Sequence, residues 1–159
     1  GFVNFDFNGL CSNENGWWYL TGGKIDFDYN GLASNEHGWW QIHGGKVDFD
    51  YNGLTANENG WWRLASGKID FDYNGFASNE NGNWRVIGGK IDFNRTGVDF
   101  DGASWWRVEG GKVNTNYNGI AQNEYGWWYI RHGKVVFDFT GWTKVSSGRY
   151  YVHNGCVNR

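Results

Sequence analysis

The feature that most restricts the fold of this chain is a strict 22-residue period. An aromatic residue recurs at that spacing without insertion or deletion, at Trp18, Trp40, Trp62, Trp84, Trp106, Trp128 and Tyr150. Glycine keeps the same register at Gly23, Gly45, Gly67, Gly89, Gly111, Gly133 and Gly155, and again at Gly9, Gly31, Gly53, Gly75, Gly97, Gly119 and Gly141. Glycine is favoured where the backbone takes a positive φ or passes close to another segment. The period therefore predicts about seven stacked units that bury their core between neighbours.

Each unit carries the pattern of a β-hairpin. Residues 17–20 and 24–29 alternate apolar and polar side chains as strands do, and Thr21-Gly22-Gly23 between them suits a hairpin turn. Asn30-Gly31 is a turn signal, and the polar residues 34–38 then link to the next Trp pair. We expect an all-β solenoid of about seven stacked 22-residue hairpin repeats. It would comprise a half-unit cap at 1–16, six hairpin-plus-linker units at 17–148 and a C-terminal hairpin cap at 149–159.

The two faces of each strand differ in composition, because successive side chains point to opposite sides. Trp18 and Leu20 share a face that is apolar in every unit, so we assign it to the core and place Ile25 and Phe27 of the second strand there too. The opposite face carries Trp17, whose equivalents include Asn83 and Arg149. Large indoles on a face that tolerates polar residues are poor core residues. This face is therefore the predicted binding surface.

At this point the chain resembles a known family. Thr140-Gly141-Trp142, Gly148-Arg149-Tyr150-Tyr151-Val152 and Gly155 look like the repeat pattern of choline-binding and related cell-wall-binding proteins, and the short repeats at the C-terminal end of clostridial toxins are similar. The resemblance implies stacked hairpins, joined to a catalytic or adhesive domain, that hold a protein on a Gram-positive cell wall or bind glycans. In the choline binders, the ligand lies in a cage of aromatic rings between hairpins.

The resemblance also implies positions for ligand-binding residues. The Trp that opens the aromatic run of the family falls on Trp17, Trp39, Trp61, Trp105 and Trp127, whereas its second cage Trp falls on Leu32, Leu54 and their equivalents, which present no π face. Sugar stacking on one flat Trp is therefore compatible with the sequence, and choline-like groups on the polymer stay open as an alternative ligand. Several weak sites along one array can bind a repeating polymer together. The predicted ligand-binding residues are Trp17, Trp39, Trp61, Trp105, Trp127, Tyr29, Tyr51, Tyr73, Tyr117 and Trp142.

Alternatives to a binding surface remain open. The outer Trp row can instead be a seam between units, in which case the protein is a purely structural stalk or spacer that displays another domain. A third class, an enzyme, would use Asp99 and Asp101 as paired carboxylates in the irregular segment 98–104. Since the remaining sequence is nearly uniform and an active site breaks symmetry, we expect no catalytic residues.

Metal binding is the weaker explanation for a second recurring motif. Asp26-x-Asp28-x-Asn30-Gly31 copies the opening of a calcium loop and recurs at 48–53 and 70–75. The twelfth position of such a loop needs an acidic ligand, but His37, Asn59 and Asn81 stand there. We expect no metal and no cofactor, and assign the Asp residues to surface charge ladders with Lys24, Lys46, Lys68, Lys90, Lys112 and Lys134.

Composition and charge exclude several partners. The net charge is −3 with Lys and Arg scattered singly, which argues against nucleic acid, and no apolar run is long enough to span a membrane. The sequence lacks an initiator Met and a signal peptide, so we expect a piece of a longer multidomain chain that is secreted or displayed at the cell surface. Cys11 and Cys156 lie near opposite ends, and we expect both thiols to be free.

Overall fold

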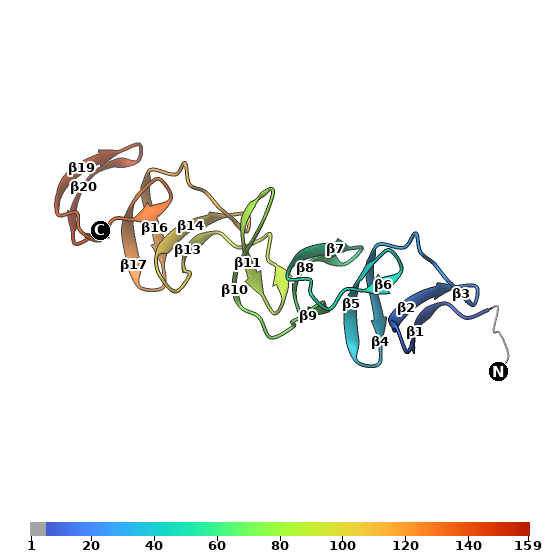
Figure 1. Cartoon of the computed structure of the whole chain (residues 1–159). Helices are drawn as coiled ribbons and strands as arrows, with labels where there is room; N and C mark the ends of the chain where they lie inside the picture. The colour runs from blue at the N-terminus through green and yellow to red at the C-terminus, as the bar shows by residue number, and fades with distance from the viewer. Residues whose placement is uncertain (1–5) are drawn as a thin grey trace. The chain divides into compact units, whose positions relative to one another are not determined.

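The computed structural model describes residues 6–159, which form 21 β-strands and no helix (Figure 1). The strands pair in antiparallel fashion, both within a repeat and between successive repeats. None of the described residues forms a helix long and apolar enough to cross a membrane. The predicted all-β hairpin solenoid of about seven 22-residue repeats is confirmed.

Every repeat contains three strands in the same order. The first strands are Gly9–Asn13 (β1), Gly31–Asn35 (β4), Gly53–Asn57 (β7), Gly75–Asn79 (β10), Gly97–Phe100 (β13), Gly119–Asn123 (β16) and Gly141–Val145 (β19). The second strands are Gly16–Thr21 (β2), Gly38–His43 (β5), Gly60–Ala65 (β8), Gly82–Ile87 (β11), Trp105–Glu109 (β14), Gly126–Arg131 (β17) and Gly148–His153 (β20). The third strands are Lys24–Ile25 (β3), Lys46–Val47 (β6), Lys68–Ile69 (β9), Lys90–Ile91 (β12), Lys112–Val113 (β15), Lys134–Val135 (β18) and Cys156–Val157 (β21).

The main hairpin of each repeat joins the first and second strands, as β4 and β5 show. Their register runs from Gly31 opposite Ile42 to Asn35 opposite Gly38. The polar stretch that we expected to be a linker is therefore the tip of this hairpin. The Oδ1 atom of Asn35 accepts the backbone N–H of His37 at 2.9 Å, an Asx turn that closes the tip.

The hairpin predicted around the Gly-Gly turn exists but is short. Ile42 and His43 of β5 pair only with Val47 and Lys46 of β6, so the expectation of a second strand extending to Tyr29 and its equivalents is wrong. The chain turns instead, because the Asp48 side chain accepts the backbone N–H of Asp50 at 3.0 Å. Phe49 lies at the outside of this turn and is 47% exposed.

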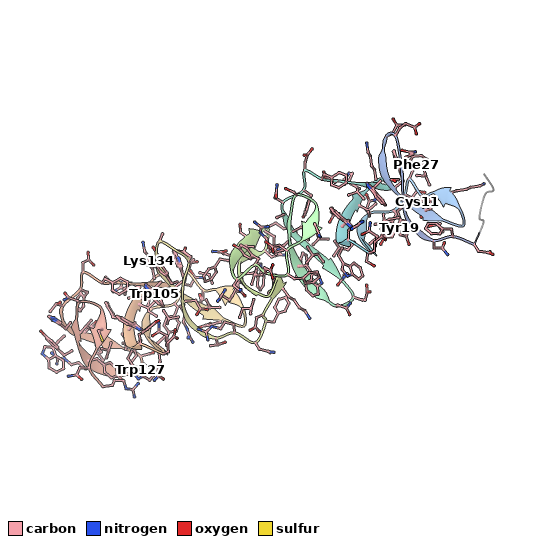
Figure 2. All side chains as sticks on the ribbon, turned by 90° about the horizontal axis from the view of Figure 1, so that it is seen from below. Cys11, Tyr19, Phe27, Trp105, Trp127 and Lys134 are labelled. Carbon is pink, nitrogen blue, oxygen red and sulfur yellow. The ribbon has the colours of Figure 1, made fainter. Side chains whose placement is uncertain are left out.

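The Phe residues of this turn are exposed in every described repeat that has one, which contradicts their assignment to the core. Phe27, which is labelled in Figure 2, is 64% exposed, and the others are nearly half exposed. A residue at the tip of a side-chain-capped turn has no strand neighbour to cover it, which explains the difference. The exposed members are Phe27, Phe49, Phe71, Phe93 and Phe137.

Successive repeats are joined by backbone pairing of the second strand of one with the third strand of the next. Trp40 of β5 lies opposite Lys68 of β9, and the Gln41 N–H donates to the Gly67 carbonyl at 2.8 Å. The glycine that precedes each third strand permits this close approach. At Gly45 φ is +82°, and a Cβ atom would lie 2.4 Å from the Asp26 carbonyl oxygen, so a side chain is excluded there.

At the centre of the core, the second strand of each repeat after the first contributes one fully buried aliphatic side chain. Ile42, Leu64, Val86, Val108, Ile130 and Val152 have no exposed surface. These are residues of the face that the sequence assigns to the core, so that assignment is confirmed for them, whereas Leu20 and Ile25 of the first repeat are only half-buried. Burial of each contributes about 1.5–3 kcal/mol relative to exposure. The Trp residues of the same face, such as Trp40, are only half-buried.

The chain divides into two compact units. The first contains the described residues up to Asn79 together with Val86–Ile91, and the second contains Glu80–Arg85 together with Asp92–Arg159. Cys11 belongs to the first unit and Cys156 to the second; both are exposed, and the prediction of two free thiols is confirmed.

Candidate functional site

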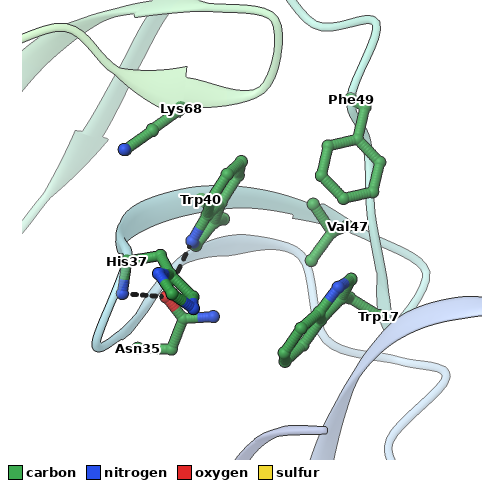
Figure 3. A pocket seen from close by; sticks show the side chains of 7 residues that line it. All are labelled: Trp17, Asn35, His37, Trp40, Val47, Phe49 and Lys68. Atoms are coloured by element: carbon green, nitrogen blue, oxygen red, sulfur yellow. Dashed lines mark hydrogen bonds between the residues drawn. The ribbon is translucent and has the colours of Figure 1, made fainter. Parts of the chain in front are cut away.

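A pocket of about 260 Å³ lies in the first unit and is lined by aromatic side chains of successive repeats (Figure 3). Trp17 comes from the first repeat and Trp40 and Phe49 come from the second. The remaining lining residues are Asn35, His37, Val47 and Lys68. The pocket therefore combines three ring systems with a polar edge, the composition expected of a small-molecule site.

Local structure fixes the orientation of the Trp40 ring. Its indole N–H donates to Asn35 Oδ1 at 3.0 Å, across the hairpin tip. The Phe49 ring meets it edge-on, with centroids 5.6 Å apart and planes at 74°. The same edge-on arrangement recurs in the pairs Trp18–Phe27, Trp62–Phe71, Trp84–Phe93 and Trp128–Phe137. The Trp–Phe pair is therefore a repeating surface element.

A lysine from the following repeat lies over each of five Trp rings. Lys68 Nζ is 5.5 Å from the Trp40 ring centroid, within the range of a cation–π contact. The other pairs are Lys46–Trp18, Lys90–Trp62, Lys112–Trp84 and Lys134–Trp106, at 5.3 to 5.9 Å. We call this set the Lys–Trp series. Glycine makes room for it, since a Cβ at Gly38 would lie 2.6 Å from Lys68 Cε.

The lysines of the Lys–Trp series contact Trp rings, whereas the sequence predicted that they form charge ladders with Asp residues. Among residues 6–159, the ion pairs join Arg or His to a carboxylate and none contains a lysine. The predicted Lys–Asp ladders are therefore wrong. The backbone register explains why, since it places each lysine opposite a Trp of the preceding repeat, as Lys68 is opposite Trp40.

Asn35 and Lys68 offer hydrogen-bond donors to the pocket. Asn35 Oδ1 already accepts from the Trp40 indole and from the His37 backbone, so its amide group is left to donate. Lys68 contributes an ammonium. His37 lies 3.6 Å from Glu36 at the exposed rim. Donors beside aromatic faces suit ligands that combine an apolar ring face with hydroxyl or carbonyl oxygens.

The predicted outer Trp residues are all half-buried, neither sealed nor fully exposed. Trp17 lines the pocket, whereas Trp39 packs against the buried cluster of Leu32, Leu64 and Ile69. Trp105 stacks on Phe100 with a centroid distance of 5.2 Å. Trp127 packs against the buried cluster that contains Val152, and its ring centroid lies 4.3 Å from Cζ of Arg159. Trp61 is also half-buried. Trp17, Trp39, Trp105 and Trp127 thus each have one side packed against a buried cluster.

The predicted Tyr residues are engaged in contacts within the chain. The Tyr29 hydroxyl donates to the Leu32 carbonyl at 2.7 Å, and its ring stacks on Tyr19 at 4.0 Å. Burial raises the pKa of the Tyr29 hydroxyl, and Tyr19 and Glu58 raise it further, which keeps it a neutral donor. The same hydroxyl-to-carbonyl bond recurs at Tyr51, Tyr73 and Tyr117. Arg63 covers Tyr73 and Arg107 covers Tyr117.

Trp142 is the most accessible of the predicted residues. It is 62% exposed, with Tyr151 edge-on at 5.5 Å and the Arg149 guanidinium 5.5 Å from its ring. It lies in β19, the first strand of its repeat, where other repeats carry an aliphatic residue or Phe76.

The Asp and Asn residues of the calcium-like motif act as turn caps. Asp26 Oδ1 accepts the Asp28 N–H at 3.1 Å, and Asn30 Oδ1 accepts the Gly44 N–H of the next repeat at 2.8 Å. These bonds recur at Asp48 and Asn52 and at Asp70 and Asn74. No cluster of three or more His, Cys, Asp or Glu suited to a metal ion occurs within residues 6–159. The recurrence of the motif is thus explained by turn geometry.

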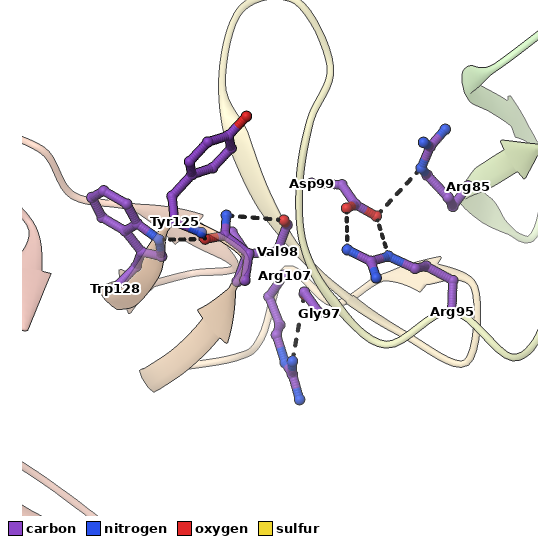
Figure 4. Close-up of polar contacts among 9 residues, drawn as sticks. Arg85, Arg95, Gly97, Val98, Asp99, Arg107, Tyr125 and Trp128 are labelled. Atoms are coloured by element: carbon purple, nitrogen blue, oxygen red, sulfur yellow. Dashed lines mark hydrogen bonds and ion pairs between the residues drawn. The ribbon is translucent and has the colours of Figure 1, made fainter. Parts of the chain in front are cut away.

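Asp99 and Asp101, the candidate pair of carboxylates, are engaged separately, and Figure 4 shows Asp99 between Arg85 and Arg95. Asp99 binds the Arg95 guanidinium through both oxygens and lies 3.3 Å from Arg85 Nε. The hydrogen bond with Asp99 raises the pKa of Arg95 above its ordinary value, against the opposing effect of burial. Asp101 instead accepts the backbone N–H groups of Ala103 and Ser104 and the Trp106 indole N–H, each at 2.8 Å. Neither carboxylate is left for acid–base chemistry on a shared substrate.

The sequence reasoning missed Trp40 and Phe49 by assigning both to the core. The Asp-x-Asp run around Phe49 is itself a signal for a capped turn, and reading it so would have placed the Phe outside. The role of Lys68 has no such signal, because it depends on pairing between residues of different repeats.

Comparison with known proteins identifies the repeats. The family model described as a choline-binding repeat matches residues 6–26, 28–48, 50–70, 72–92, 96–114, 116–136 and 138–158. A comparison with curated protein sequences finds no relative that matches the chain.

Solved structures similar to this chain are larger than it is. CbpJ from Streptococcus pneumoniae TIGR4 is 20% identical over 96% of this chain and 52% of that one, with a TM-score of 0.39. Choline-binding protein F from Streptococcus pneumoniae is 19% identical over 96% and 52%, with a TM-score of 0.37. An alternansucrase in complex with isomaltononaose is 13% identical over 96% and 12%, with a TM-score of 0.41. The chain spans about half the length of the first two.

The family match carries the assignment, because its seven segments cover most of the sequence and coincide with the seven three-strand repeats. The chain belongs to the choline-binding repeat family.

Proposed function

We propose that this chain is a non-catalytic module that binds a cell-wall polymer or glycan through repeated aromatic surfaces. The observation that carries the proposal is the pocket in which Trp17 of one repeat faces Trp40 and Phe49 of the next. The other predicted Trp residues, Trp39, Trp61, Trp105, Trp127 and Trp142, would form further contact points along the array.

The charge of the pocket favours a neutral sugar over a quaternary ammonium group. Lys68 already places an ammonium over the Trp40 ring. A ligand cation would have to displace it and would be repelled by it, since like charges a few ångströms apart destabilise each other. A sugar face can stack on Trp17 while its oxygens accept hydrogen bonds from Lys68 and Asn35.

Repetition supports a polymeric ligand. The Trp–Phe pair occurs in five repeats at a constant spacing in sequence. When several weak sites bind one chain of repeating sugars, avidity exceeds the affinity of a single site by about 10² to 10⁴. A wall polymer or cell-surface glycan meets this requirement, so we place the protein outside the cell, secreted or at the surface, as one part of a larger multidomain chain.

The test is a binding titration of the full chain with single-pocket variants. Probes are glucose oligosaccharides, N-acetylglucosamine oligosaccharides and choline chloride, followed by intrinsic Trp fluorescence and by retention on purified cell walls. Trp17→Ala and Phe49→Ala should each weaken the binding of the favoured sugar at least fivefold. Ile87→Ala, which removes an exposed apolar side chain outside the pocket, should leave it unchanged.

Other outcomes would redirect the assignment. Tighter binding of choline than of every sugar would contradict the neutral-ligand proposal. An absence of binding to all probes and to cell walls would favour the second candidate function, a structural stalk that displays another domain. The half-buried outer Trp residues are the observation that favours this alternative, because Trp17, Trp39, Trp105 and Trp127 each have one side packed within the chain.

A further inference from the structure

Positive charge is concentrated in the last repeats of the chain. Residues 1–102 contain seven Lys and Arg against fourteen Asp and Glu, whereas residues 103–159 contain seven against three. The overall charge of −3 conceals this asymmetry. A local excess of cations raises the concentration of anions nearby and favours their binding.

A cavity of about 430 Å³ lies among these cations, in the second unit. It is bordered by β17 and β19, which supply Arg131 and Lys144, and its other lining residues include Asn118, Gly119, Tyr129 and Ser146. It shares no residue with the aromatic pocket. The two sites can therefore be tested independently.

Three departures from the repeat pattern meet at this cavity. Other repeats carry Thr21, His43, Ala65, Ile87, Glu109 or His153 at the position of Arg131. At the position of Lys144, they carry Ser12, Ser34, Ala56, Ser78, Phe100 or Gln122. Ser146 replaces the acidic residue found as Glu14, Glu36, Glu58, Glu80 and Glu124. The chain has thus gained two cations and lost one carboxylate at a single place.

The Arg131 guanidinium is held in position without being neutralised. Its Nε donates to Asn118 Oδ1 at 3.3 Å and its Nη1 donates to the Tyr129 hydroxyl at 3.2 Å. These bonds use two of the five N–H groups of a guanidinium. Across the described part of the chain, no carboxylate lies within ion-pair distance of Arg131 or Lys144.

The positive charge of Arg131 also affects the pKa of the neighbouring Tyr129 hydroxyl. Its side chain is buried, and burial alone would raise the pKa of the hydroxyl. Hydrogen bonds with Arg131 and Thr143 and the charge of Arg131 nevertheless lower that pKa below its ordinary value. An environment that favours a phenolate also favours any other oxyanion placed beside the guanidinium.

We propose that the Arg131–Lys144 cavity is a binding site for a phosphate ester. A planar guanidinium binds two oxygens of a phosphate at once, and an ammonium binds phosphate as a point charge. A phosphate group presents oxygens on several sides, so Arg131, Lys144 and the Ser146 hydroxyl can each bind a different one. A carboxylate has only two oxygens in one plane and fits such a divided set of donors less well.

The experiment is a titration of the full chain at low ionic strength, followed by NMR of the Arg131 side chain and by calorimetry. The probes are glycerol 3-phosphate, acetate and glycerol. Glycerol 3-phosphate should bind saturably, at least tenfold more tightly than acetate, and glycerol should not bind. Arg131→Gln and Lys144→Gln should each weaken the binding of glycerol 3-phosphate about tenfold.

Matched variants separate a built site from general charge. Lys24→Gln removes the same charge from an exposed lysine outside the cavity and should leave the affinity unchanged. Ser146→Glu restores the acidic residue of the other repeats and should abolish binding while the fold is retained. Equal weakening by Lys24→Gln, or equal affinity for acetate, would overturn the proposal. Neither outcome involves the aromatic pocket, so the proposal that Trp17 binds a sugar is tested independently of the phosphate site.

Discussion

Lys68 of the third repeat places its ammonium 5.5 Å from the ring centroid of Trp40 in the second. The backbone pairing of the same two residues fixes this contact, because Trp40 and Lys68 are register partners in β5 and β9. The protein thereby supplies its own cation to the aromatic surface. In a family named for a cationic ligand, this contact bears directly on which ligand each aromatic pocket can accept.

Replacing Lys68 should change ligand preference in a defined direction. Lys68→Gln removes the competing cation and leaves the Trp40 and Phe49 rings in place. The affinity for choline chloride should then rise about fivefold, equivalent to about 1 kcal/mol of cation–π energy. Trp fluorescence titration of the full chain measures it. Lys68→Arg keeps a cation over the ring and serves as the control, and equal choline affinity of the two variants would refute the competition.

At Trp128, a lysine can be added opposite a Trp ring that lacks one. Cys156 lies opposite Trp128 as Lys68 lies opposite Trp40, but no Lys or Arg contacts the Trp128 ring among the residues that the structure describes. Space is available, since a Cβ at Gly126 would meet nothing within 4 Å. Cys156→Lys should therefore extend the Lys–Trp series and stabilise the fold by about 0.5–1 kcal/mol.

Thermal unfolding provides the measurement for this variant. A gain of this size raises the Tm of a chain of this length by about 1–4 °C. Cys156→Ala, which removes the thiol without adding a cation, is the matched control and should leave the Tm where it is. If the Lys variant melts no higher than the Ala variant, the cation over each Trp contributes no stability.

The sequence predicted the repeat architecture because the period and the alternation are local signals. Ile42 and its equivalents in the later repeats fall on the face that is apolar in every repeat, and they are fully buried. The prediction for Phe49 was wrong because an Asp-x-Asp segment is compatible with either an alternating strand or a capped turn. The hydrogen bond that the Asp48 side chain accepts from the Asp50 backbone stabilises the turn. Lys68 was misassigned because its partner lies in another repeat.

Stability should depend on the buried aliphatic position of each second strand. Ile42 is fully buried in the cluster of Leu10, Ala33 and Val47, so Ile42→Ala should cost about 2–5 kcal/mol through lost burial and a cavity. Ile87, the neighbour in sequence of a buried valine, is 44% exposed, and Ile87→Ala should change stability by no more than about 0.5 kcal/mol. Urea unfolding and amide hydrogen exchange of the second repeat measure the difference. Similar losses at both sites would contradict the assignment of the core.

Acid sensitivity provides a test at Asp101, whose carboxylate takes the place of the amide of Asn35 in the repeat pattern. Both side chains accept the backbone N–H two residues on and the indole N–H five residues on. The backbone hydrogen bond from Ser104 is the main cause of a lowered pKa of Asp101, helped by those from Ala103 and Trp106 and opposed by burial. The ionised form is thus the one that the folded state prefers.

The sign of the resulting pH dependence follows from linkage. Because the pKa of Asp101 is lower in the folded chain, its stabilising effect is present above the unfolded value of about 3.9 and is lost as the pH falls through the folded value. Asp101→Asn should fold normally at neutral pH, since Asn13, Asn35, Asn57 and Asn123 make the same bonds with an amide oxygen. It should also lose less stability on acidification than the unaltered chain.

Urea unfolding at a series of pH values, followed by Trp fluorescence, measures this difference. Asp72→Asn removes another exposed carboxylate and controls for net charge. A parallel loss of stability in the unaltered chain and in Asp101→Asn would show that the Asp101 carboxylate makes no pH-dependent contribution. A fall in stability of Asp101→Asn at neutral pH would show instead that the irregular fifth repeat requires the charge, and that Asp101 is not equivalent to Asn35.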